Sequence, residues 1–147
     1  MTLLSIEFAS PLYDESVALR YEVLRKPLGR SFTEEQLALE WSDYHLAALD
    51  ASGQMRAILL LTPQAGGVLK MRQVAVAPEW QGRGVGAALV EYSEAFAKSQ
   101  NFNKIALHAR ETAVPFYRRL GYEFEAGLFE EVGIPHLKMW KNLDTSK

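Results

Sequence analysis

The chain has 147 residues, of which 48% are hydrophobic and 23% are charged, and its formal net charge is −2. This length and composition favour one globular domain over residues 1–147. The near-neutral charge, with lysine and arginine scattered, argues against nucleic acid or an anionic membrane as a partner. The chain has no cysteine, which excludes disulfides and thiolate metal sites. It shows no signal-peptide pattern and no apolar run near the ~18 residues of a membrane span, so we expect a cytoplasmic protein.

The first half of the chain is predicted to form a strand, two helices and a β-hairpin. Ser10 and Pro11 suit a helix start, because Ser10 offers a capping hydroxyl and proline is favoured at the first helical position. Thr33 and Gln36 have the spacing of a capping box, which predicts a second, short helix. In chain order we expect a strand over 4–8, a helix from 10 to about 26–29, a helix from 33, and strands over 44–49 and 55–61.

The second half combines strands with two further helices. In chain order the pattern predicts a strand over 68–76, a helix over 84–99, a strand over 104–108, a helix over 113–120, and strands over 122–126 and 134–140. The whole order is β α α β β β α β α β β. We therefore expect an α+β fold with a mixed, mostly antiparallel sheet of seven strands and about four flanking helices. The helix over 84–99 should form a right-handed parallel crossover.

A glycine-rich turn connects the strand over 68–76 to the helix over 84–99. It contains Gly82, Gly84 and Gly86. A strand that enters a helix through glycines exposes backbone N–H groups at the positive end of the helix dipole, where phosphate groups commonly bind. The turn therefore predicts a phosphate-binding site.

Two common phosphate-binding patterns fit this turn poorly. A P-loop needs Lys and then Ser or Thr after its glycines, and residues 84–87 are Gly-Val-Gly-Ala. The dinucleotide fingerprint G-x-G-x-x-A fits Gly82, Gly84 and Ala87, but it needs an acidic residue about 20 positions further on to bind the ribose. Phe102 and Asn103 stand there instead, so nicotinamide binding has little support.

Two other motifs fit better. Residues 81–86, Gln-Gly-Arg-Gly-Val-Gly, match Q/R-x-x-G-x-G/A, and residues 113–122 match A-x-x-F-Y-x-x-x-G-F/Y. Both motifs, and the strand residues 73–78, resemble those of the GNAT-type N-acetyltransferases, in which the first motif binds the pyrophosphate of acyl-coenzyme A. Residues 129–136, with the pattern F-x-E-x-G-I-P-H, resemble a bacterial subset of that superfamily whose substrates are mostly unassigned. The resemblance extends over nearly the whole chain and is weakest over residues 1–40.

The resemblance implies acetyl-CoA as co-substrate. The glycine loop would bind the pyrophosphate, and the free edge of the strand over 68–76 would pair with the pantetheine arm. In this family the N–H of Val76 would polarise the thioester carbonyl, and Tyr117, the tyrosine of the F-Y pair, would protonate the leaving thiolate. The cofactor-binding residues implied in this way are Val74, Ala75, Val76, Gln81, Gly82, Arg83, Gly84, Val85, Gly86, Ala87, Arg110 and Tyr117.

Arg110 departs from the family's pattern. Many members have an asparagine at this position, which contacts the coenzyme arm. The longer, charged side chain of Arg110 could reach the coenzyme phosphates or the acceptor, and the sequence leaves both roles open.

The acceptor side and the general base are less determined by the sequence. His108 shares a strand face with Arg110, and Glu130 and His136 lie near the family's acceptor side, so these are the candidate substrate-contacting residues. The three histidines lie on separate predicted elements without metal-ligand spacing, so no metal is expected. The base stays open among Glu40, His45, Glu79, His108, Glu111 and His136.

These features predict an N-acetyltransferase in which a primary amine of a small molecule or peptide attacks the acetyl group of acetyl-CoA directly. The alternative is a non-catalytic coenzyme A-binding regulatory or interaction module. In that case the apolar residues Leu137, Met139 and Trp140 would form a dimer interface. A homodimer is also an expectation from the family.

Overall fold

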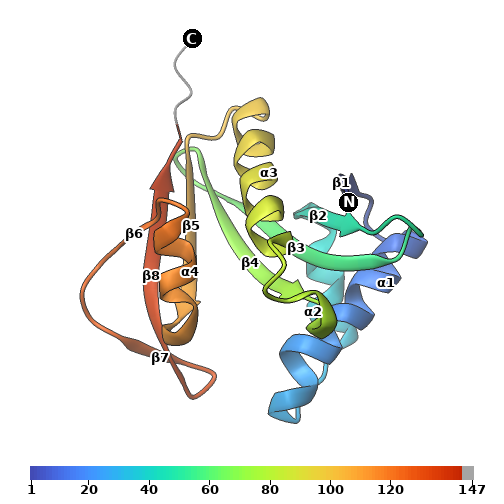
Figure 1. The fold of residues 1–147 in the computed structure, drawn as a ribbon. Helices are drawn as coiled ribbons and strands as arrows, with labels where there is room; N and C mark the ends of the chain where they lie inside the picture. Colours follow the sequence, from blue (N-terminus) through green and yellow to red (C-terminus); the bar gives the residue numbers. More distant parts are fainter. Residues whose placement is uncertain (144–147) are drawn as a thin grey trace.

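The computed structural model describes residues 1–143, which form an eight-stranded sheet flanked by helices (Figure 1). The strands are β1 (Thr2–Ile6), β2 (Tyr44–Leu49), β3 (Met55–Gln64), β4 (Val68–Val76), β5 (Lys104–Arg110), β6 (Glu123–Phe124), β7 (Phe129–Glu131) and β8 (Ile134–Asn142). The α-helices are α1 (Pro11–Arg20), α2 (Glu34–Ala38), α3 (Val85–Ser99) and α4 (Val114–Arg119). None of the helices in the described residues is long and apolar enough to cross a membrane.

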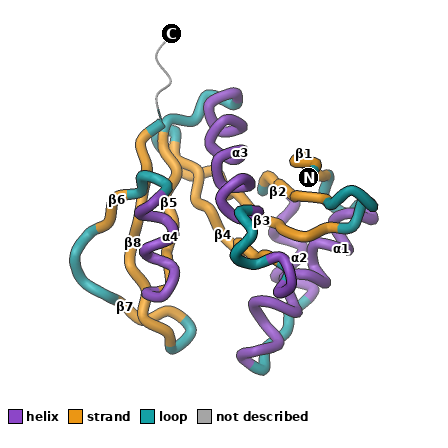
Figure 2. Tube along the Cα trace, viewed as in Figure 1, coloured by secondary structure: helices purple, strands orange, loops and turns teal. Residues whose placement is uncertain are grey.

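The order of strands across the sheet is β1-β2-β3-β4-β5-β8-β6, and β7 pairs with β8 beside this path. β4 and β5 are parallel and are connected through α3, whereas the other neighbours are antiparallel. Figure 2 shows how short loops connect these strands and helices. The predicted α+β class, the mixed sheet and the parallel crossover are confirmed.

The sheet has eight strands, where the sequence predicted seven. The additional strand, β7, forms a hairpin with β8 through a turn at Val132 and Gly133. Both turn residues have positive φ, 50° at Val132 and 74° at Gly133. A turn of this kind is usually marked by Asn-Gly, because β-branched residues rarely adopt positive φ. Because position 132 is valine, the sequence lacks the residue pair that usually indicates this turn.

Both faces of the central strands are buried. On β3, Leu59 and Leu61 pack in the core that contains the apolar side of α3, whereas Ile58 and Leu60 pack in a second core with Leu19 of α1. Strands buried on both faces have continuous apolar runs, as residues 58–61 do. The helices α1 and α3 thus cover opposite faces of this part of the sheet.

The helical run that begins with α1 continues beyond Arg20. It passes through a π-helical turn over Tyr21–Arg25 and a 3₁₀ turn over Lys26–Leu28, and it ends at Gly29, whose φ is 67°. The predicted end of this helix is therefore confirmed. The capping box of Thr33 and Gln36 is also present, with both hydrogen bonds formed.

A charged cluster is buried between α1 and the segment before β2. Arg20, with 0% of its surface exposed, donates two hydrogen bonds of 2.9 Å to the Glu40 carboxylate. Tyr13 donates a third of 2.8 Å, and burial together with this bond raises the pKa of Tyr13 to about 12. Burial opposes the ionisation of Glu40, but the hydrogen bonds and charge of Arg20 outweigh it and hold the pKa of that carboxyl below its usual range. Glu40 is therefore a buried ion-pair partner.

His45 belongs to the same cluster. Its Nε2 donates to the backbone carbonyl of Glu40 at 2.9 Å, because a carbonyl oxygen can only accept. Burial lowers the pKa of His45, which keeps the ring neutral near pH 7. Glu40 and His45 were candidate bases, but both are engaged in this cluster and neither lines the cavity described below.

β4 and β5 separate partway along their length. Their pairing ends at Met71–Leu107. Beyond this point β4 runs to Val76 paired only with β3, and β5 runs to Arg110 paired only with β8. A register shift between β3 and β4 lies at Gln73, whose φ is 57°, so a bulge bends β4 there. The facing edges of β4 and β5 are therefore unpaired, and the two strands diverge in Figure 1.

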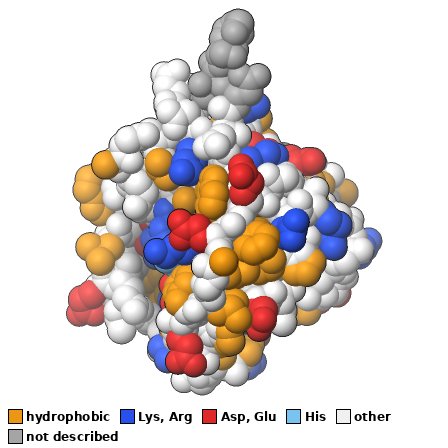
Figure 3. Space-filling view, turned by 90° about the vertical axis from the view of Figure 1, so that its left-hand side faces the viewer, with side chains coloured by type: hydrophobic (Ala, Val, Ile, Leu, Met, Phe, Trp, Pro, Cys, Tyr) orange, Lys and Arg blue, Asp and Glu red, His pale blue; other side chains and the backbone are white. Residues whose placement is uncertain are grey.

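The C-terminal strand does not offer the expected apolar surface. Leu137 and Met139 are buried in the core of their own chain, with 9% and 1% of their surface exposed. Trp140 is half-buried and lies near Lys104. The prediction that Leu137 and Met139 form a dimer interface is therefore wrong, whereas the homodimer itself stays a prediction. On the face shown in Figure 3, hydrophobic side chains are interspersed with charged ones.

Replacing Glu40 should destabilise the fold strongly. In Glu40→Gln the guanidinium of Arg20 stays buried without its counter-charge, so we expect the free energy of unfolding to fall by about 3–5 kcal/mol. Urea unfolding measures this change. The control is Glu22→Gln, which makes the same substitution in an exposed ion pair with Lys26 and should cost at most about 1 kcal/mol. Equal losses in the two variants would contradict the assigned role of the buried pair.

Candidate functional site

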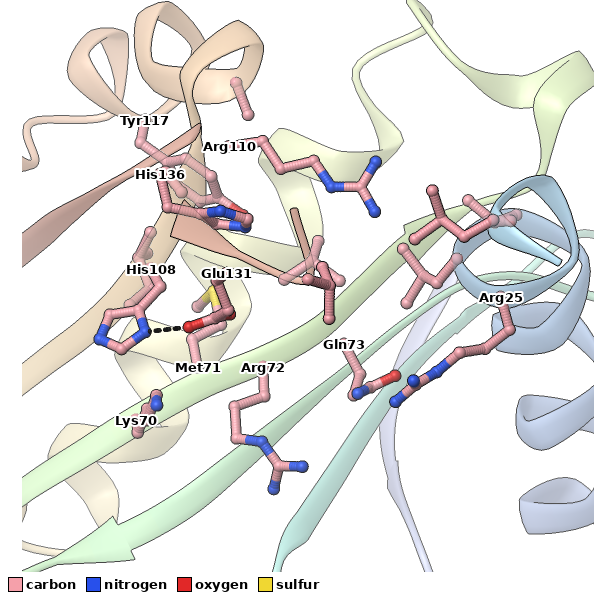
Figure 4. A pocket seen from close by; sticks show the side chains of 18 of the residues that line it. Arg25, Lys70, Met71, Arg72, Gln73, His108, Arg110, Tyr117, Glu131 and His136 are labelled. Carbon is pink, nitrogen blue, oxygen red and sulfur yellow. Dashed lines mark hydrogen bonds and ion pairs between the residues drawn. The ribbon is translucent and has the colours of Figure 1, made fainter. Parts of the chain in front are cut away.

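A cavity of about 530 Å³ lies where β4 and β5 separate (Figure 4). Its walls come from the π-helical turn after α1, from β4 and β5, from the start of α4 and from the β7–β8 hairpin. Segments far apart in the sequence therefore contribute side chains to one space. The polar side chains that line it include those of Arg25, Lys70, Gln73, Arg110, Tyr117 and His136.

The backbone of β4 directs hydrogen-bonding groups toward this gap. The N–H of Ala77 donates to the carbonyl of Arg56 on β3 at 2.8 Å. Because peptide groups alternate in direction along a strand, the N–H and C=O of Val76 point to the opposite edge. The side chain of Gln81 supports this direction, since its amide donates to the Val76 carbonyl at 3.0 Å. The N–H of Val76 thus faces the unpaired edge.

The glycine loop lies beside this edge and opens α3. Gly82 and Gly84 have φ of 75° and 83°, the left-handed region that favours glycine. Gly84 is the N-cap of α3 and provides no side-chain acceptor, so the first N–H groups of the helix, at residues 85–87, have no capping partner. Gly86 lies in the first turn of α3, and a Cβ built on it would lie 3.4 Å from a methyl group of Val76, so the start of the helix packs against the strand.

Of the other residues predicted to bind the cofactor, some line the cavity and others do not. Val74, Gln81 and Arg110 line the cavity. The side chain of Ala75 is buried in the core on the α1 side, so only its backbone could contact a ligand. Arg83 is exposed, and its guanidinium lies 4.0 Å from the centre of the Trp80 ring.

Tyr117 is held in the wall of the cavity by α4. Only 7% of its surface is exposed, and its ring makes edge contacts with Phe116 and Tyr122. Burial raises the pKa of Tyr117 to about 12. The phenol therefore keeps its proton throughout the neutral range and can act there as a hydrogen-bond donor or an acid.

His136 lies on β8 opposite Arg110 and lines the same cavity. Its Nδ1 lies 2.7 Å from the carbonyl oxygen of Ile134, which can only accept a hydrogen bond. In the neutral ring the proton is therefore on Nδ1, and Nε2 keeps its lone pair. This tautomer lets Nε2 accept a proton.

His108 and Glu131 form a pair on another wall of the cavity, as Figure 4 shows. His108 Nδ1 lies 2.8 Å from Glu131 Oε1. Burial opposes the ionisation of Glu131, but the hydrogen bond and charge of His108 outweigh it and lower the pKa of that carboxyl. Glu130, the predicted neighbour, is exposed and does not line the cavity. Glu131 therefore takes the position expected of Glu130.

The sequence analysis missed several residues of this cavity. Lys70 and Arg72 alternate on β4 with the buried Leu69 and Met71, a period-2 pattern that marked them as one face of a strand. Gln73 has a positive φ but is not glycine, so no residue type in the sequence indicated the bulge at this position. The polar lining residues that were missed include Arg30, Lys70, Arg72, Gln73 and Glu131.

Within residues 1–143, no three His, Asp or Glu side chains are grouped so that they could hold a metal ion.

The profile of the family described as "Acetyltransferase (GNAT) domain" matches residues 13–143. The uncharacterized N-acetyltransferase YjcF of Bacillus subtilis is 29% identical over 125 residues, which cover 84% of this chain and 88% of YjcF. The uncharacterized protein YyaT of Bacillus subtilis is 30% identical over 78 residues, 53% of each chain. That second match spans about half the length of YyaT.

Solved structures are similar over almost the whole chain. A candidate N-acetyltransferase from Lactobacillus plantarum is 27% identical with a TM-score of 0.84, and the match covers 97% of this chain and 99% of that one. An aminoglycoside 6′-N-acetyltransferase complexed with coenzyme A is 18% identical with a TM-score of 0.80, covering 97% of each chain. At that identity the second likeness concerns the fold alone. Because the family profile covers residues 13–143, the chain belongs to the GNAT acetyltransferase family.

Proposed function

We propose that this protein transfers the acetyl group of acetyl-CoA to the nitrogen of a primary amine. One observation carries the proposal: a free strand edge at Val76, an uncapped helix start at residues 85–87 and the buried phenol of Tyr117 lie around one gap in the sheet. Each suits a different part of an acyl-coenzyme A thioester, and family membership supports the same chemistry.

The coenzyme would bind through the backbone more than through side chains. The N–H groups of residues 85–87 suit a pyrophosphate, and the start of α3 packs beside Val76 of β4. The unpaired edge of β4 at Val74 and Val76 can add the amide-bearing pantetheine arm as a short extra strand. A GNAT-fold relative was solved with coenzyme A, which agrees with this assignment.

Three groups of the protein would act on the reaction. Acetyl-CoA supplies an activated acetyl group, whose carbon bonds to the amine nitrogen as its bond to sulfur breaks. The N–H of Val76 would stabilise the negative charge on the carbonyl oxygen. Tyr117 would hold a proton for the departing sulfur, and its raised pKa keeps that proton in place until negative charge develops nearby. His136 Nε2 would accept the proton that the attacking nitrogen loses.

Tyr117→Phe tests the proposed acid. Without the phenol the departing sulfur has no proton donor, so we expect kcat to fall by about 100-fold while coenzyme A binding persists. A thiol-release assay and calorimetry measure the two quantities. Tyr122→Phe is the matched control, because Tyr122 is also buried and its ring lies 5.7 Å from that of Tyr117, but it does not line the cavity.

Unchanged turnover in Tyr117→Phe would remove this residue from the mechanism. Coenzyme A binding without acetyl transfer to any amine of a broad panel would instead support a non-catalytic coenzyme A-binding module.

Gly84→Ala tests the proposed coenzyme site. Alanine at this left-handed N-cap strains the loop that positions the N–H groups of α3, so we expect the Kd for coenzyme A to rise by about tenfold. Gly66→Ala is the matched control: its φ of 79° is close to the 83° of Gly84, both sites have open space for a Cβ, and Gly66 lies in the distant β3–β4 turn. Weaker coenzyme binding in both variants, or in neither, would contradict the assignment.

A further inference from the structure

We infer that the acceptor amine carries an oxyanion group, a carboxylate or a phosphate, in addition to its amine. The inference rests on the proposed acetyl transfer and adds the chemical class of the acceptor. It comes from the distribution of charge around the cavity.

The cavity is strongly basic in a chain that is weakly acidic overall. Five arginine or lysine side chains line it, against the one carboxylate of Glu131, whereas the whole chain has a net charge of −2. That carboxylate is already engaged by His108 at 2.8 Å. A concentration of one sign of charge in a cleft attracts ligands of the opposite sign.

Most of these cations form no ion pair with a carboxylate of the described residues. Arg72 lies 3.5 Å from Asp43, whereas no carboxylate of residues 1–143 lies within ion-pair distance of Arg25, Arg30 or Lys70. Burial, and then the positive charges of Arg30, Arg20 and Arg72, lower the pKa of Arg25. An anionic group bound here would relieve this repulsion and form charge-assisted hydrogen bonds.

Lys70, Arg72 and Arg25 lie on the side of the sheet away from the proposed coenzyme loop. Leu69 and Met71 face the core that contains α3, so the alternating Lys70 and Arg72 face the opposite side of β4. Arg25 belongs to the helical run that continues α1, which packs on that same opposite side. The pyrophosphate of a coenzyme bound at the start of α3 would therefore leave these cations free for the acceptor.

A hydrogen-bond acceptor of the protein, suited to the amine end of the substrate, lies next to the cations. Gln73 Oε1 is buried without a hydrogen-bond partner among the described residues. In Figure 4 its side chain extends from β4 toward Arg25. A neutral oxygen can accept an N–H of the amine, while Arg25 and Lys70 hold the oxyanion. This wall would repel polycations such as the aminoglycosides named for one structural relative.

The first experiment measures acetyl transfer to matched pairs of amines. The pairs are β-alanine with β-alaninamide, and O-phosphoethanolamine with ethanolamine, at equal concentrations of unprotonated amine; spermidine and kanamycin are the polycations. We expect kcat/KM to be about tenfold or more higher for the anionic member of at least one pair. The two pairs separate a carboxylate from a phosphate preference. Equal rates within both pairs, or a polycation as the best acceptor, would overturn the inference.

The second experiment assigns the effect to Arg25. Arg25→Gln should raise KM for the preferred anionic acceptor by about tenfold and leave the Kd for coenzyme A within about twofold. Arg25→Lys, which keeps the charge, should recover part of the loss. Lys26→Gln is the matched control, because it removes a charge at the next residue, which is exposed, paired with Glu22 and outside the cavity. If Arg25→Gln weakens coenzyme A instead of the acceptor, the inference fails.

A binding measurement separates this inference from the proposed function. Calorimetry of the coenzyme A-loaded protein compares O-phosphoethanolamine with ethanolamine and β-alanine with β-alaninamide, without any turnover. Preferential binding of an anion that Arg25→Gln abolishes supports the inference even if no acetyl transfer occurs, in which case only the proposed function fails. Binding of neither anion, or equal binding within both pairs, contradicts the inference. Lys70→Gln provides the same test should Arg25→Gln fail to fold.

Discussion

The end of pairing between β4 and β5 is the constraint on which the rest of the site depends. Beyond Met71–Leu107 the two parallel strands no longer pair with each other. β4 pairs only with β3 there, and β5 pairs only with β8. A sheet normally satisfies its backbone groups by pairing, so an interior edge left open is available to a ligand. The bulge at Gln73 bends β4 at this place, and the cavity occupies the gap that follows.

The two sides of the gap present different chemical groups. On one side, α3 and its glycine loop offer backbone N–H groups, which suit phosphate oxygens without adding side-chain charge. On the other side, the turn after α1 and the outer face of β4 offer arginine and lysine. Arg20 lies in the helical run that carries Arg25, and its buried ion pair with Glu40 connects this run to the segment before β2. Rigid support of this kind is what a site needs to hold charges in place.

Much of the fold could be predicted because its signals are local. The period of apolar residues, the capping box at Thr33 and the glycines at 82 and 84 each act within a few residues. The strand β7 was not predicted, because its turn contains Val132 in a positive φ that a β-branched side chain disfavours. Glu130 was expected near the acceptor, although the glutamate of the F-x-E pattern is Glu131. Neighbouring residues on a strand face opposite sides, and the register of the hairpin places Glu131 at the cavity.

The sequence by itself determined the fold class and the glycine loop at the start of α3, because hydrophobic periodicity and the spacing of the glycines record them. Tyr117 and His136 were expected in the site from the family resemblance, and both line the cavity. Only the tertiary structure decided which charges share a space. Arg25, Lys70 and Arg110 are far apart in the chain, and they meet because the helical run after α1 packs beside β4 while β5 turns away from it. Their common electrostatic field depends on distances in space, and those distances follow from the packing of the whole sheet.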